Sequence, residues 1–175
     1  MKWILDSSAL ITLGKLRILE KVIALRRTLI VPRGVYQEAV EQGIERGASE
    51  AEYIKTFIQN KALPVLDGKE KATELFEEVP FLSDVDKEVL ALAKEQKGIA
   101  IIDEARARSV AERFAIEYHG VMYILLKLLE EKKITRKEAI LYVDEMIRQG
   151  FYLSREKHGE MLETIERIVG KHNKD

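Results

Sequence analysis

The 175-residue chain has no cysteine, only three histidines and three prolines, and no excess of charge of either sign. Without cysteine it can form no disulfide, no thiolate nucleophile and no cysteine-ligated zinc site. The 29 basic and 30 acidic side chains nearly cancel, so any surface that attracts nucleic acid must be local. No apolar run approaches the roughly 18 residues of a membrane span. The opening MKWILDSS becomes acidic too soon for a signal peptide, so we expect a cytoplasmic protein.

Short apolar runs alternate with helical patterns along the first two thirds of the chain, which is typical of a parallel sheet covered by helices. The runs are apolar on both faces, as buried parallel strands are. They span residues 3–5, 28–31, 63–66, 99–102 and 115–118. We therefore expect a three-layer α/β/α domain with five parallel strands. Two strand orders are common in such sheets, 3-2-1-4-5 and 2-1-3-4-5, and the pattern alone does not distinguish them.

Serine and threonine caps predict helices between and after these strands, beginning after Ser83, Thr135 and Ser154. Glu138 stands three residues after Thr135 and completes a capping box. After residue 119 the pattern is helical only. We expect one domain with three parts, which are a core over residues 1–119, a helical extension over 120–170 packed on the core, and a frayed tail over 171–175.

Three acids directly follow two of the apolar runs. Asp6 follows the first run, and Asp103 and Glu104 follow the fourth. Ligands of open parallel sheets bind at the carboxyl ends of the strands, where the strand order reverses. In the order 3-2-1-4-5 the first and fourth strands are neighbours, so Asp6 and Asp103 would meet. In the order 2-1-3-4-5 they would be separated.

Helical periodicity selects one further acid, in the helix that follows Ser83. With about 100° of rotation per residue, the apolar arc that begins at Val85 includes Asp86. Asp84 and Glu88 fall on the opposite, solvated side. An acid on a buried helix face has two explanations. It either completes a capping interaction with Ser83 or points into a shared carboxylate site.

Each of these acids also has a purely structural explanation, because carboxylates are favoured at helix N-termini. Asp6 can cap the helix after the first strand, and Asp103 and Glu104 can cap the helix after the fourth. Clustered carboxylates repel one another, however, and a divalent cation would relieve that repulsion. Oxygen ligands without cysteine or histidine suit Mg²⁺ or Mn²⁺.

Four segments, taken in order, resemble the PIN domain, the metal-dependent nuclease fold of VapC-type toxins. They read WILDSSALITL, VPRGVYQEAV, LSDVDKEVLALA and IAIIDEARARSVAERFAIEYHG. The later segment GFYLSREKHGEML resembles a subgroup of PIN-domain proteins of unassigned role. The resemblance covers nearly the whole chain, and it depends on four short motifs at compatible spacing.

The resemblance implies a four-acid site that also acts as the metal site, composed of Asp6, Glu38, Asp86 and Asp103. Glu38 lies well off the apolar arc of its own helix, so its assignment depends on the resemblance alone. Ser8 matches a small hydroxyl residue that supports the site in this family. Two positions depart from the family pattern. Ile102 stands where many PIN domains have threonine or serine, and Glu104, kept as a supporting residue, stands where the subgroup often has a second aspartate.

The resemblance further implies hydrolysis of RNA with one or two Mg²⁺ or Mn²⁺ ions, a toxin role with an antitoxin protein as partner, and a homodimer. Arg33, Arg106 and Arg108 are the candidates for contacting backbone phosphates. Part of the apolar surface of the helical extension is expected to form the dimer interface. We predict the strand order 3-2-1-4-5, because the metal-site hypothesis requires it.

Three other classes of protein are alternatives to this hypothesis. A haloacid-dehalogenase-type phosphatase requires a second aspartate two residues after the first, where this chain has Ser8. A response-regulator receiver clusters its acids after the first and third strands, and only Asp67 follows the third run here. A PIN-like module that binds RNA or protein without cleavage remains an open alternative.

Overall fold

The computed structural model describes residues 1–68 and 74–172, and it contains one parallel sheet in the order β3-β2-β1-β4-β5. The strands are β1 (Lys2–Leu5), β2 (Thr28–Pro32), β3 (Val65–Leu66), β4 (Ile99–Ile101) and β5 (Tyr118–His119). The register aligns Ile4 with Ile30 on one side and with Ala100 on the other. The predicted order 3-2-1-4-5 is confirmed, so β1 and β4 are neighbours at the centre of the sheet.

Helices follow every strand, as expected for this architecture. Before β4 they are α1 (Ser7–Lys15), α2 (Leu19–Ile23), α3 (Arg33–Tyr36), the π-helix η1 (Gln37–Glu41), α4 (Gln42–Glu45), α5 (Ser49–Gln59) and α7 (Asp84–Gln96). After β4 they are α8 (Ala105–Arg113), α9 (Val121–Glu130), α10 (Arg136–Arg148) and α11 (Arg155–His172). No described helix is long and apolar enough to cross a membrane.

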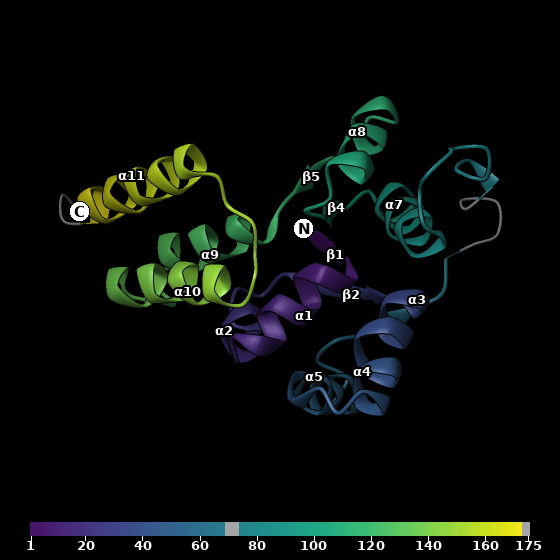
Figure 1. Cartoon of the computed structure of the whole chain (residues 1–175), viewed down its shortest axis with the longest axis horizontal. Coiled ribbons are helices and arrows are strands. Elements are labelled where there is room, and N and C mark those ends of the chain that lie inside the picture. The colour runs from purple at the N-terminus through teal and green to yellow at the C-terminus, as the bar shows by residue number, and fades with distance from the viewer. Residues whose placement is uncertain (69–73, 173–175) are drawn as a thin grey trace.

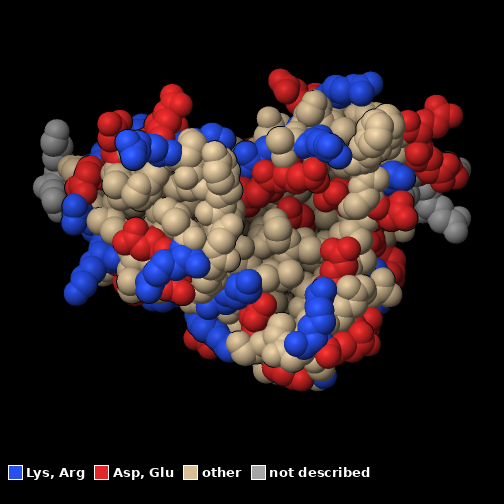
Figure 2. Space-filling model, in the orientation of Figure 1, with Lys and Arg blue, Asp and Glu red and all other residues tan. Residues whose placement is uncertain are grey.

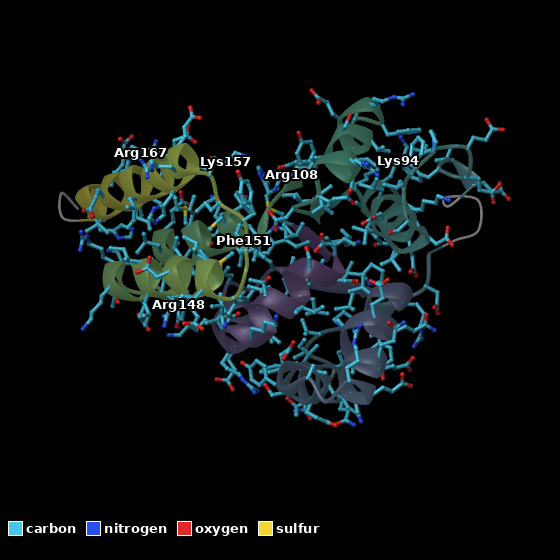
Figure 3. All side chains as sticks on the ribbon, viewed as in Figure 1. Lys94, Arg108, Arg148, Phe151, Lys157 and Arg167 are labelled. Atoms are coloured by element: carbon cyan, nitrogen blue, oxygen red, sulfur yellow. The ribbon has the colours of Figure 1, made fainter. Side chains whose placement is uncertain are left out.

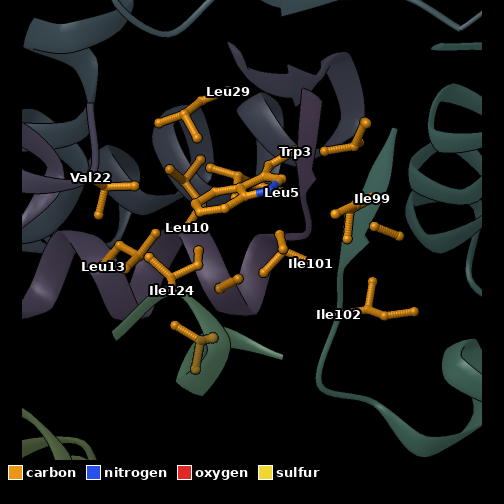
Figure 4. Packing of buried hydrophobic residues seen from close by; sticks show 14 of the residues in the cluster. Trp3, Leu5, Leu10, Leu13, Val22, Leu29, Ile99, Ile101, Ile102 and Ile124 are labelled. Carbon is orange, nitrogen blue, oxygen red and sulfur yellow. The ribbon is translucent and has the colours of Figure 1, made fainter. Parts of the chain in front are cut away.

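The sheet lies between two layers of helices (Figure 1). On one face α7 packs against β1, β2 and β4. On the other face Trp3, fully buried, meets the edge of Tyr123 from α9 with ring centroids 5.7 Å apart. Side chains of α1, α2 and α9, including Leu10 and Ile124, surround Trp3 there (Figure 4). Successive residues of a strand point to opposite faces, so this apolar strand is buried on both sides.

The helix caps expected from the sequence are present. Ser83 Oγ accepts a hydrogen bond from the backbone of Asp86 at the start of α7, and Thr135 and Glu138 form a capping box at the start of α10. Ser154 Oγ accepts from the Lys157 backbone N–H in the first turn of α11. α11 continues through His172, and the rest of the predicted frayed tail, residues 173–175, lies outside the described residues.

The predicted positions of the third and fifth strands were partly wrong. The third strand is shorter than residues 63–66, and β5 starts at Tyr118 rather than at Ala115. Ala115 follows the end of α8 with φ +52°, a left-handed conformation that reverses the chain direction and is incompatible with a strand. The ladder therefore begins later, and Ile102 N donates to the His119 carbonyl at 2.8 Å.

Most of the apolar residues in the C-terminal helices are used inside this chain. Buried examples are Ile124, Leu125, Leu128, Leu129, Met146, Met161 and Ile165. α9 contacts α10 and α11, and the three helices gather at one end of the molecule (Figure 1). Leu141 and Ile147 on α10 remain 52% and 38% exposed. Few apolar residues of this segment are therefore left for an interface with another molecule.

Candidate metal centre

Asp6 is a buried acid at the carboxyl end of the central strand β1. Its side chain is the N-cap of α1 and accepts from the Ala9 backbone N–H at 2.6 Å. Ser8 Oγ donates to the two carboxylate oxygens at 3.0 and 3.1 Å. The Asp6 backbone N–H donates to the Ile101 carbonyl on β4, which fixes Asp6 at the junction of the two strands. Asp6 is therefore both a helix cap and a candidate ligand.

Burial raises the pKa of Asp6 from 3.8 to about 7. The charge of Asp103 raises this pKa further, while hydrogen bonds from Ala9, Ser8 and the Asp103 backbone lower it. Desolvation has the largest effect because the side chain is only 5% exposed. A carboxylate held in this environment would be stabilised by a cation beside it. Capping alone does not require such a buried charge.

Asp103 lies in the corresponding position after β4, and its two oxygens are held by different elements. Arg108 Nη2 donates to Oδ1 at 2.8 Å, and the Val121 backbone N–H at the start of α9 donates to Oδ2 at 3.0 Å. Burial raises the pKa of Asp103, whereas the Val121 hydrogen bond and the charges of Arg108 and Lys157 lower it. Asp103 is thus fixed between α8 and α9.

Gly120 allows this close packing around Asp103. A Cβ added to Gly120 would lie 2.2 Å from Asp103 Oδ1 and 2.4 Å from Arg108 Nη2. Either distance is far below van der Waals contact. Only glycine therefore lets the chain pass this carboxylate and its arginine without displacing them.

Glu38 is half-buried and accepts a hydrogen bond from Ser7 Oγ at 2.5 Å. Ser7 directly follows Asp6, so Glu38 reaches the same end of the sheet from the helix after β2. The helical wheel placed Glu38 off the apolar arc of its helix, and its half-buried position beside Ser7 agrees with that placement. Glu38 belongs to η1, a π-helix.

Asp86 is half-buried, and its Oδ2 accepts from Ser83 Oγ at 2.6 Å. The capping explanation for this acid therefore applies. Asp84 is exposed, as the wheel indicated, with its side chain 98% accessible. Glu88 is not free in solvent, because it accepts from the backbone N–H groups of Arg33 and Gly34 at 3.1 and 2.7 Å and links α7 to α3.

The structure places Asp6 and Asp103 together, and it attaches Glu38 and Asp86 to serines. Among residues 1–68 and 74–172, no group of three or more acidic, histidine or cysteine side chains is arranged to hold a metal ion. Of the two supporting residues, Ser8 contacts Asp6, whereas Glu104 is exposed and makes no side-chain cap at the start of α8. The donor chemistry of the Asp6–Asp103 pair, two carboxyl groups with raised pKa values, suits a hard divalent cation.

The three candidate arginines have different environments. Arg33 is exposed and pairs with Asp67 at 3.1 Å. Arg106 is exposed on α8, with its guanidinium 5.9 Å from the centre of the Phe81 ring. Arg108 is half-buried, and besides Asp103 it donates from Nε to the Ile102 carbonyl at 2.9 Å. Figure 2 shows acidic side chains gathered in the hollow at the centre of this face, with basic side chains on either side of it.

A parallel sheet in this order, with acids at the carboxyl ends of its two central strands, defines a nuclease-like α/β fold. The family model described as PIN domain matches residues 2–167, and the chain belongs to this family. No curated protein matches the chain. The PIN-domain match confirms the family resemblance found in the sequence. PIN domains are generally nucleases.

Three contacts around these acids were not anticipated from the sequence. Ser7 holds Glu38, Lys157 places a positive charge near Asp103, and Gly120 provides the space for the Arg108 pair. Ser7 could have been noticed, because it is a hydroxyl residue directly after Asp6. Nothing in the sequence pattern signals Lys157, because it reaches Asp103 from α11, more than fifty positions along the chain.

Proposed function

We propose that this protein is a metal-dependent ribonuclease that hydrolyses RNA phosphodiester bonds. The observation that carries the proposal is the pair of carboxyl groups, Asp6 and Asp103, at the ends of adjacent central strands. When bound, Mg²⁺ or Mn²⁺ supplies an activated water and balances the charge that develops on the phosphate. Asp6 and Asp103 are the main ligands in this proposal. Glu38 and Asp86 would complete the site if their carboxylates exchanged the hydrogen bonds to Ser7 and Ser83 for the ion.

The local charges support a polyanionic substrate. The net charge of the chain is −1, so attraction to RNA must come from basic groups near the acids. Arg108 contacts Asp103 directly, and Arg33 and Arg106 lie exposed at the starts of α3 and α8. Backbone phosphates are sequence-independent targets for such side chains. In this proposal the arginines position RNA, and the acids hold the metal that acts on it.

A binding module without catalytic activity is the second candidate. It is favoured by the hydrogen bonds that all four proposed acids accept from their own chain, and by the lack of a three-acid cluster among the described residues. Both candidates use the same surface for RNA. They differ only in whether a divalent ion enters and the phosphodiester is cleaved.

Cleavage of a labelled structured RNA with Mg²⁺, with Mn²⁺ and with EDTA tests the two candidates. We expect cleavage with either ion, none with EDTA, and a loss of at least about a hundredfold in rate for Asp6→Asn and Asp103→Asn. Asp84→Asn is the matched control, because Asp84 is exposed at the same end of the fold, and it should cleave like the wild type. If the wild type cleaves nothing with any divalent ion, the protein is a binding module.

We further propose a cytoplasmic toxin that is held inactive by an antitoxin, with residues 1–119 as nuclease core and 120–170 as helical extension. A homodimer interface would use the outer face of α10, where Leu141 and Ile147 are exposed. Light scattering should give twice the mass of the chain, and the double variant Leu141→Lys, Ile147→Lys should be monomeric. A monomeric wild type contradicts the dimer without affecting the nuclease proposal.

A further inference from the structure

A pocket of about 660 Å³ opens beside Asp103, between α8, α9 and the start of α11. This volume is within the range of pockets that bind small organic molecules. Asp103 itself lines the pocket, together with Arg108 and Lys157. The pocket therefore connects with the candidate metal centre but belongs largely to the helical extension.

The inner wall of the pocket is apolar. It is formed by Met122, Leu126, Phe151, Leu153 and Met161. Tyr152 stands at its edge with 87% of its surface exposed. An exposed aromatic ring beside an apolar recess is the arrangement on which unpaired nucleic-acid bases stack.

Two cations lie on the polar side of the pocket. Figure 3 shows Arg108 on α8, Lys157 at the start of α11 and Phe151 in the connection before α11, around the space between the two helices. Arg108 uses two hydrogen bonds to hold Asp103 and the Ile102 carbonyl. A guanidinium carries five N–H donors, so Arg108 can keep these contacts and still donate to a phosphate. Asp103 and Glu160 also line the pocket, so its formal charges balance and the attraction for a phosphate is local to Arg108 and Lys157.

We propose that this pocket binds an unpaired RNA base next to the scissile phosphate, with the base against Tyr152 and Phe151 and the adjoining phosphate against Arg108 and Lys157. The proposal rests on the proposed ribonuclease function, and it assigns the helical extension a role in choosing the cleavage site. An apolar recess beside two cations and a candidate metal ligand matches one nucleotide, which is apolar on its base and anionic at its phosphate.

The test measures binding separately from cleavage. A labelled single-stranded RNA and an abasic ribose–phosphate oligomer of the same length are titrated in EDTA and followed by fluorescence anisotropy. We expect the wild type to bind the RNA about tenfold more tightly than the abasic oligomer, within the range that one stacked base contributes. Tyr152→Ala, and Thr164→Trp, which fills the pocket from α11, should remove this difference. Leu75→Ala is the control for an exposed apolar side chain outside the pocket.

Lys157→Ala tests the proposed contact between the Lys157 ammonium group and a phosphate, and Lys137→Ala on α10 is its control. Lys157→Ala should weaken binding of both oligomers alike and lower the salt dependence by about one phosphate contact. Lys137 is exposed and does not line the pocket, so its variant should match the wild type. Thermal unfolding checks that Thr164→Trp folds. If it does not, the exposed Tyr152 still provides a test.

The results separate this inference from the ribonuclease proposal. Base-dependent RNA binding without cleavage by any divalent ion supports the pocket and overturns the ribonuclease. If the wild type cleaves RNA but Tyr152→Ala and Thr164→Trp keep its RNA affinity, the pocket does not bind an RNA base. The ribonuclease proposal then stands, and a protein segment is the alternative occupant of the pocket.

Discussion

The carboxyl group of Asp6 makes the stability of the metal-free protein depend on pH. Its pKa is raised from 3.8 to about 7, so between these values the folded state holds a proton that the unfolded state has lost. The stability contributed by this proton is complete below about pH 4 and is lost as the pH rises through about 7. Burial raises the pKa of Asp103 too, and it acts in the same direction.

Asp6→Asn removes the part of this pH dependence that Asp6 contributes. Asparagine caps a helix about as well as aspartate and carries no charge to desolvate. We expect the variant to be more stable than the wild type above pH 7 in EDTA, and to lose that advantage toward pH 4. Urea unfolding across this range measures the difference. Asp84→Asn, at an exposed position, should show the same dependence of unfolding free energy on pH as the wild type. If Asp6→Asn differs from the wild type by the same unfolding free energy at every pH, desolvation does not act on the Asp6 carboxyl group.

At Gly120, the absence of a Cβ atom allows the close packing of Asp103 and Arg108. Gly120→Ala places a methyl group within 2.4 Å of both Asp103 Oδ1 and Arg108 Nη2. We expect it to lose about 1–3 kcal/mol of unfolding free energy through overpacking and to reduce cleavage by displacing Asp103. Gly159→Ala in α11 is the matched control, because a Cβ added at Gly159 would have no atom within 4 Å outside its own helix turn and chain neighbours. It should gain about 0.5–1 kcal/mol from helix propensity, and equal effects in both variants would contradict the packing argument.

At the level of elements, Glu88 connects α7 to the start of α3. It accepts from the Arg33 and Gly34 backbone N–H groups, which have no partner within their own helix because they lie in its first turn. Glu88→Ala leaves these donors unpaired and should cost about 1–3 kcal/mol in urea unfolding. Glu88→Gln retains one acceptor and should cost less. If both variants unfold like the wild type, water replaces the carboxylate and the link contributes nothing to stability.

The sequence pattern predicted most elements because their determinants are local. Apolar runs marked β1, β2 and β4, and the hydroxyl groups of Ser83 and Thr135 marked α7 and α10. One error arose where the backbone departs from regular geometry, because Ala115 in a left-handed conformation delayed β5. Another arose from a tertiary contact, because Glu88, expected on a solvated helix face, accepts hydrogen bonds from the start of α3.

The candidate site was predictable in part for the same reason. Asp6 and Asp103 follow apolar strands directly, so their meeting required only the correct strand order, which the structure provides. Three separate elements act on Asp103, through hydrogen bonds from Arg108 and Val121 and through the charge of Lys157. Their convergence depends on how α8, α9 and α11 pack, which no local pattern encodes.

At the scale of the whole molecule, metal binding and folding stability are linked. A ligand that binds only the folded state stabilises it by an amount that grows with its concentration above Kd. In the proposed site, Mn²⁺ would also neutralise the repulsion that adds to the raised pKa of Asp6. This relief of repulsion is part of the binding free energy that sets Kd. The melting temperature of the wild type should rise with Mn²⁺ concentration at a pH above 7, where Asp6 is ionised.

Differential scanning calorimetry with and without Mn²⁺ measures this effect. At a hundredfold excess over Kd the stabilisation should approach about 2.7 kcal/mol. Asp6→Asn and Asp103→Asn should respond less, because each removes one ligand, while Asp84→Asn should respond like the wild type. Asp6→Asn should also start from the higher melting temperature in EDTA, since it carries no buried charge. An ion-induced shift of equal size in all four proteins would indicate that Mn²⁺ binds elsewhere on the surface, and Asp6 and Asp103 would then be helix-capping and packing residues only.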